Sequence, residues 1–158
     1  MSSESSRIAA QLRHAFGGQP WHGPPLSELL ANVTPTQAIA RPIPGAHNIQ
    51  ELVLHIDVWL RAALDAARGI AMPKLYRTEK DWQVVTEIDA AAWIHATQCL
   101  FQGGEQLAQT IEEFPDARLR DVVPGREYDF YYLFHGIVQH SLYHAGQIAL
   151  LRSASGVA

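Results

Sequence analysis

The residues best suited to chemistry lie near the carboxyl end of this 158-residue chain, in the stretch HSLYHAGQIALLR. His140 and His144 are four positions apart there. In a helix this spacing places both side chains on one face, with Cβ atoms about 5–6 Å apart. Both imidazoles could then reach one metal ion at bond lengths of about 2.0–2.1 Å. Many helices carry such a pair by chance, so the spacing is necessary but not sufficient.

Two interpretations of this pair stay open. Each ring could be a buried histidine that is hydrogen-bonded to a carbonyl or hydroxyl group. Two metal-free rings side by side in a dry interior, however, leave polar nitrogens unsatisfied and resist protonation of both rings. A third ligand would favour the metal. His55 is the candidate, because it lies at the edge of the apolar face of another helical segment, which an antiparallel arrangement would bring level with His140 and His144.

The other polar residues near these positions are weaker candidates. Gln147, one turn beyond His144, could orient a ligand or contact a substrate, or it could cap a buried carbonyl. Asp57 is a possible base, but it falls on the polar side of its helix, where we expect it to be solvated. The remaining five of the eight histidines are expected on the surface or in loops, although His22 could line the mouth of a pocket: His14, His22, His47, His95 and His135.

Apolar residues recur with helical spacing in four long segments, which must position the histidines. A capping-box pattern, Asn48 with Glu51, marks the start of the second. The pair Gly103-Gly104 costs about 1 kcal/mol per glycine within the third and indicates a kink or a close approach by a neighbour. The expected long helices cover residues 5–16, 48–67, 88–114 and 130–153, with a short amphipathic piece at 26–32.

The segments between these helices are expected to be irregular. Three prolines within residues 34–46 forbid a continuous helix. Residues 70–87 are predicted to be a connector, and residues 119–123 could form a short strand. The predicted fold class is therefore all-α, a four-helix bundle with long connectors, in one domain spanning residues 1–158. Sites in such bundles are built from side chains on facing helices.

Composition excludes several classes of protein. The net charge is −4 and the basic residues are scattered, so we expect no nucleic-acid partner. No apolar run approaches the roughly 20 residues that cross a bilayer, and the first residues lack the pattern of a secretory signal. We therefore expect a cytoplasmic protein with no membrane partner. The single cysteine, Cys99, cannot form an internal disulfide and is expected to be a small core residue.

Two stretches carry a resemblance to a known family. GAHNIQELVLHIDVW and YYLFHGIVQHSLYHAGQIALLR resemble the two histidine-containing regions of the DinB superfamily (DinB/YfiT-like proteins), the second more specifically than the first. The resemblance implies a four-helix bundle, frequently dimeric, in which His55, His140 and His144 hold a divalent metal ion with an open position. His47 departs from the large residue, often tryptophan, that the family has there, which affects packing rather than ligation.

These observations lead to a functional hypothesis with two alternatives. The hypothesis is a metal-dependent enzyme, a hydrolase or a low-molecular-weight-thiol-dependent transferase, which acts on a small substrate of unknown identity and uses a divalent ion, zinc or nickel foremost. One alternative is a non-catalytic metal-binding module for stress response or interaction, and another is a metal-free bundle that binds an apolar ligand. If Leu54 and Val58 join an exposed apolar patch, a homodimer follows.

Overall fold

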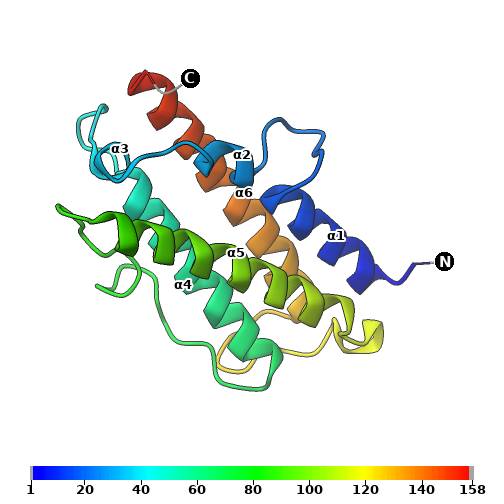
Figure 1. The fold of residues 1–158 in the computed structure, drawn as a ribbon. Coiled ribbons are helices and arrows are strands. Elements are labelled where there is room, and N and C mark those ends of the chain that lie inside the picture. Colours follow the sequence, from blue (N-terminus) through cyan, green and yellow to red (C-terminus); the bar gives the residue numbers. More distant parts are fainter. Residues whose placement is uncertain (1, 157–158) are drawn as a thin grey trace.

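Four long helices dominate the structure, a computed structural model that describes residues 2–156. They are α1 (Glu4–Phe16), α4 (Ile49–Ala67), α5 (Ala90–Glu112) and α6 (Phe130–Ala154), as Figure 1 shows. Two short helices, α2 (Leu26–Leu30) and α3 (Pro35–Ile39), lie between α1 and α4, and a single 3-10 turn, Asp116–Arg118, lies between α5 and α6. The all-α prediction is confirmed.

The ends of the long helices follow from local capping. Asn48 accepts a hydrogen bond from the backbone N–H of Glu51, whose side chain accepts one from the N–H of Asn48, so the expected capping box is present. Asp89 and Asp129 cap α5 and α6 through their side chains alone, which accept from the amides of Ala92 and Tyr132. The four long segments expected from apolar spacing therefore begin and end within about two residues of the observed bounds.

The segment 34–46 contains a helix that the sequence analysis did not predict. Pro35 lies in the first turn of α3, where the missing N–H costs nothing. Thr34 caps this turn, and Gln37 completes a capping box with it. The prolines at 42 and 44 come after α3 has ended, so they forbid a longer helix without forbidding a short one.

No strand occurs in the described part of the chain. Residues 119–123, which could have formed one, contribute only an isolated bridge between Val122 and Asp129. The segment instead forms turns that hold the start of α6, because the amide of Phe130 donates to the carbonyl of Asp121.

Helices α1 and α5 run antiparallel. The amides of Glu4 and Ser5 each donate to the carboxylate of Asp116 at 2.9 Å, just beyond the end of α5. At the other end of α1, the ring of Phe16 packs edge-on against Phe101, farther back along α5. Helices α4 and α6 are antiparallel too, because Met72, which follows α4, contacts Tyr128, which precedes α6, through its sulfur.

Helices α4 and α5 both begin beside α3 and run in the same general direction (Figure 1). The indole N–H of Trp93, at the start of α5, donates to the carbonyl of Val33 at 2.7 Å, and Asn48, which caps α4, contacts the carbonyl of Ile39. The connector 68–89 must therefore return along the whole length of α4. Its Met72, soon after the end of α4, donates its amide to Pro124, whereas its Val85 donates its amide to Glu51 in the first turn of α4.

The paired glycines of α5 permit close approach by two neighbouring helices. A Cβ added at Gly104 would lie 2.7 Å from the ring of Phe16, and one added at Gly103 would lie 3.2 Å from a carboxylate oxygen of Asp57. Helix α5 continues through both positions. The close approach, rather than a break in the helix, accounts for the glycines.

Two surface expectations can be compared with the structure. Leu54 and Val58 are half-buried and pack against the core, so they form no exposed patch by themselves. The homodimer stays a prediction. No helix in residues 2–156 has the length and apolar character needed to cross a membrane.

Gly104→Ala should lower the free energy of unfolding. Alanine gains about 1 kcal/mol in helix propensity, but displacing the Phe16 ring costs about 1–3 kcal/mol. The matched control is Gly146→Ala on α6, where an added Cβ meets no atom within 4 Å and the propensity gain should appear alone. Denaturant unfolding measures the free energy of unfolding of both variants. A stabilised Gly104→Ala variant would show that the Phe16 contact is not tight.

Candidate metal centre

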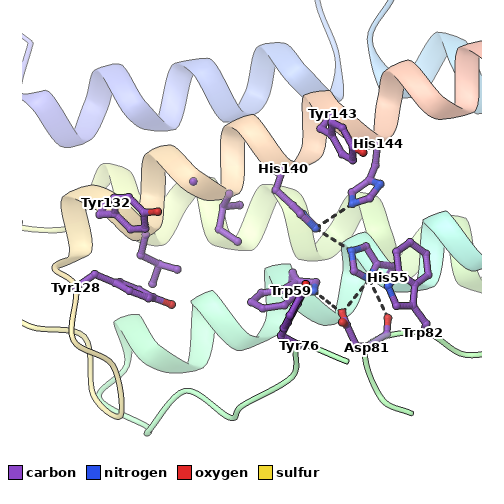
Figure 2. A pocket seen from close by; sticks show the side chains of 13 residues that line it. His55, Trp59, Tyr76, Asp81, Trp82, Tyr128, Tyr132, His140, Tyr143 and His144 are labelled. Atoms are coloured by element: carbon purple, nitrogen blue, oxygen red, sulfur yellow. Dashed lines mark hydrogen bonds and ion pairs between the residues drawn. The ribbon is translucent and has the colours of Figure 1, made fainter. Parts of the chain in front are cut away.

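The three histidines singled out from the sequence lie together in the interior of the bundle. The Nε2 atom of His140 is 2.9 Å from Nε2 of His55 and 3.1 Å from Nε2 of His144. One ring nitrogen from each residue lies within 4.8 Å of the other two. Figure 2 shows the three rings converging, two from α6 and one from α4. The expected meeting of His55 with the pair on α6 is therefore present.

These separations suit a shared ion. Two nitrogens bound at about 2.0–2.1 Å, with angles between 90° and tetrahedral at the ion, lie about 2.8–3.4 Å apart. The two measured distances, 2.9 Å and 3.1 Å, fall in this interval. His55 and His144 are buried, with 6% and 4% of their surface exposed. A cation here would be largely shielded from bulk water.

The tautomer of His55 is set by Asp81, which lies in the connector. Nδ1–H of His55 donates to the backbone carbonyl of Asp81 at 2.8 Å, and the carboxylate Oδ1 of Asp81 is 3.1 Å from the same nitrogen. Both partners are acceptors, so Nδ1 carries the proton. Nε2 of His55 therefore presents a lone pair to the centre of the cluster.

Gln147 has the corresponding role for His144. Its side-chain Oε1 is 2.7 Å from Nδ1 of His144, one turn away on α6. Nδ1 donates to this oxygen, which leaves Nε2 of His144 with a lone pair. The role of Gln147 in orienting a ligand, one of the two interpretations of its position, has this contact in its favour.

The proton inventory of the cluster fits a cation. Two lone pairs, from His55 and His144, face Nε2 of His140, and a single N–H there can satisfy only one of them fully. Nδ1 of His140 is buried and has no hydrogen-bond partner within residues 2–156. A metal ion would accept all three Nε2 lone pairs and leave only this Nδ1–H unsatisfied. The residues present therefore fit a bound divalent ion.

The environment keeps all three imidazoles neutral near pH 7. Burial, assisted by the neighbouring His144 and His55, lowers the pKa of His140 to about 3. Burial likewise lowers the pKa of His144 to about 4, although the hydrogen bond to Gln147 opposes it. The pKa of His55 is also lowered by burial, against the opposing effect of Asp81. Metal ligation requires the neutral form of the ring.

Asp81 and Trp82 are the site residues that sequence analysis missed. The carboxylate of Asp81 is 3% exposed and accepts hydrogen bonds from the Trp59 indole N–H at 2.8 Å and from the Arg77 amide at 2.9 Å. Trp82 stacks on the ring of His55, with centroids 3.8 Å apart. Both residues occupy a charged connector without periodicity, so no local pattern marks them.

His47 supports this arrangement from the surface. Its ring stacks on the other face of Trp82, with centroids 3.6 Å apart, and its Nδ1 is 3.1 Å from a carboxylate oxygen of Glu51. His47 is exposed, as expected, but it also fixes the position of Trp82. Burial alone would raise the pKa of Glu51, but hydrogen bonds from Val85, Arg41, His47 and Asn48 outweigh it and lower the pKa.

A cavity of about 370 Å³ opens beside the three histidines. It extends from the rings along α6 toward its start, and the connector and α4 close its other side (Figure 2). Aromatic side chains form much of its wall, including Tyr76, Tyr128, Tyr132 and Tyr143. The cluster therefore adjoins a space large enough for a small molecule.

The remaining sequence candidates lie elsewhere. His14 and His22 line a separate surface hollow, so His22 does not border the histidine cavity. His95 is exposed on α5, and His135 is half-buried on α6, with Nε2 4.0 Å from a carboxylate oxygen of Glu4. None of the four joins the cluster.

Two expectations about single residues are wrong. Cys99 is not a core residue: it is half-buried on α5, with its sulfur 3.6 Å from Nε2 of His95. Asp57 is not freely solvated, because it is 14% exposed and paired with Arg61 at 2.7 Å. It is not among the residues that line the cavity, and a carboxylate oxygen lies toward Gly103 of α5, so it is not placed to act as a base there.

The metal-free protein should lose stability as the pH falls below about 6.5, the ordinary pKa of histidine. The unfolded chain takes up protons on His140 and His144 from that pH downward, whereas the folded chain resists until the pKa of about 3 for His140 and of about 4 for His144. The unfolded state thus binds more protons in this window, and the free energy of unfolding decreases with falling pH.

Denaturant unfolding in chelator between pH 7.5 and 4.5 measures this effect. The control is a variant with both His140→Gln and His144→Gln, whose stability should depend less on pH. If the free energy of unfolding changed equally with pH in wild type and control, the two rings would not be buried in their neutral form.

A comparison with known proteins agrees with this site. A family model described as the DinB superfamily matches residues 24–148, which include His55, His140 and His144. No curated protein and no solved structure matches the chain. The match covers most of the chain, from α2 to the last turns of α6. The chain belongs to the DinB superfamily.

Proposed function

We propose that His55, His140 and His144 bind one divalent metal ion and that the ion serves an enzyme reaction. The observation that carries this proposal is the convergence of three Nε2 atoms. Nε2 of His140 lies between the other two, 2.9 Å from that of His55 and 3.1 Å from that of His144. Asp81 and Gln147 hold the outer two rings in the tautomer that coordination requires.

The ligand set favours certain metals. Imidazole nitrogen suits zinc, nickel, copper and iron, whereas calcium and magnesium prefer oxygen ligands. The described residues bring no carboxylate or thiolate together with the three rings as a further ligand. Zinc or nickel is therefore our first expectation.

The surroundings support a catalytic use of the ion rather than a structural one. Structural zinc sites are closed by four protein ligands, while catalytic sites keep three and leave a position open. Here three histidines border a cavity of about 370 Å³. This arrangement disfavours a module in which the ion only tightens the bundle.

The reaction is proposed to be hydrolysis, or a transfer that depends on a low-molecular-weight thiol, on a small substrate. When bound, a divalent ion with neutral ligands supplies Lewis-acid activation of water, a thiol or a polarised substrate oxygen. The chain's own part is positional. Asp81 keeps the ring of His55 aimed at the cavity, and Trp82 covers one face of that ring and keeps water from it.

The purified protein should bind one equivalent of zinc or nickel, and His140→Ala should abolish this binding, because His140 supplies the nitrogen nearest both others. His135→Ala, on the same helix but outside the cluster, is the matched control and should bind like wild type. Elemental analysis and calorimetric titration give the stoichiometry. Unchanged binding by His140→Ala would refute the site.

Asp81→Asn should weaken metal binding about 10- to 100-fold, as loss of such outer partners typically does. The amide keeps the size of the side chain but removes the charge that orients His55. Asp57→Asn is the control, since Asp57 is also shielded but faces α5. Competition against a chromophoric chelator measures the dissociation constants. Equal affinities in both variants would show that Asp81 serves the connector alone.

A further inference from the structure

The cavity beside the histidines is walled mainly by aromatic rings. Those on α4 and the connector face those on and just before α6 (Figure 2). Tyr128 and Tyr132 pack against each other at the end far from the histidines, with centroids 5.2 Å apart. The aromatic lining residues are Trp59, Tyr76, Trp82, Tyr128, Tyr132 and Tyr143.

No free charge of the described chain lines this cavity away from the histidines. The lining contains no lysine, arginine or glutamate. Its one carboxylate, that of Asp81, is 3% exposed, and both oxygens already accept hydrogen bonds. The nearby guanidinium of Arg77 lies over the ring of Tyr76, 5.1 Å from its centroid, and is not part of the lining. A charged group on a ligand would find no ion-pair partner here, only the neutral hydroxyl groups of the tyrosines, and would give up part of its hydration against the aromatic walls.

Gly136 makes the space between the histidines and the tyrosines. On α6, the residues at 133, 136, 137, 140 and 144 line the cavity in the spacing of one helical face. All except Gly136 carry side chains. A Cβ added at Gly136 would meet no atom within 4 Å, so packing does not require the glycine. Its lack of a side chain leaves room beside His140.

We propose that this cavity binds a substrate whose body, apart from the group that meets the metal, is uncharged and aromatic or aliphatic, and that Gly136 determines the space for this body. The inference rests on the proposed function, because the reacting group is placed at the three histidines. It specifies the substrate class and disfavours thiols or substrates that carry carboxylates beyond the reacting group.

Two probes with the same ring framework test the proposal on the full chain. N-phenylnaphthylamine is neutral, and anilinonaphthalene sulfonate adds one anionic group. Both are titrated into chelator-treated protein, so that no ion attracts the sulfonate. Probe fluorescence and energy transfer from Trp59 and Trp82, which line the cavity, report binding. The variants are Gly136→Ala and Gly136→Leu, with Gly146→Leu as control, since Gly146 also lies on α6 in open space.

The neutral probe should bind wild type with one-to-one stoichiometry, and about tenfold or more tightly than the sulfonate, because the anion gives up hydration without gaining an ion pair. Its affinity should fall stepwise with the size of the residue at 136, by about tenfold or more for leucine. Gly146→Leu should bind like wild type. Zinc stoichiometry and melting temperature of Gly136→Leu should match the control.

Equal affinity of Gly136→Leu and Gly146→Leu for the neutral probe would overturn the assignment of Gly136. Equal or tighter binding of the sulfonate would overturn the inferred charge of the substrate. If Gly136→Leu did not fold, the loss expected for Gly136→Ala would still test the proposal. Because the probes are titrated without metal, a failure of zinc binding would refute the metal proposal separately.

Discussion

The buried carboxylate of Asp81 is the group on which the arrangement of the site depends. A charge that is 3% exposed is tolerated only when its oxygens are satisfied. They accept from the indole of Trp59 on α4 and from the amide of Arg77 within the connector, and Oδ1 lies 3.1 Å from Nδ1 of His55. One side chain therefore anchors an irregular segment to a helix and orients the ring of His55. Its charge also favours a cation on the far side of that ring.

The path of the chain explains why such an anchor exists. Helices α4 and α5 begin at the same end of the bundle, so the connector 68–89 crosses the length of α4 without regular structure of its own. A segment of this kind pays the entropy of ordering without helical hydrogen bonds. Contacts at Asp81 and Val85 hold it to α4, and the amide of Met72 donates to the carbonyl of Pro124, before α6. The same crossing delivers Trp82 and Tyr76 to the cavity.

The site combines polar ligands with an apolar approach. Three neutral imidazoles converge at one end of the cavity, where they could hold an ion, and aromatic side chains form much of the remaining wall. Beside such apolar walls, a bound ion would act more strongly on a substrate group than it does in bulk water. Membership of the DinB superfamily supports the metal site, and the shape and charge of the cavity narrow the chemistry that reaches it.

The sequence by itself determined the features that depend on local periodicity and capping. Helical spacing placed His140 and His144 on one face, and Asn48 with Glu51 marked the start of α4. The prolines of residues 34–46 do not predict α3 from the sequence, although proline in a first turn is compatible with a helix. His55 is expected as the third ligand from its position in the pattern and from family resemblance.

Only the tertiary structure decided the register of α4 against α6, the place of Asp81 and Trp82, and the open space at Gly136. These depend on contacts between residues far apart in the chain, which no local pattern encodes.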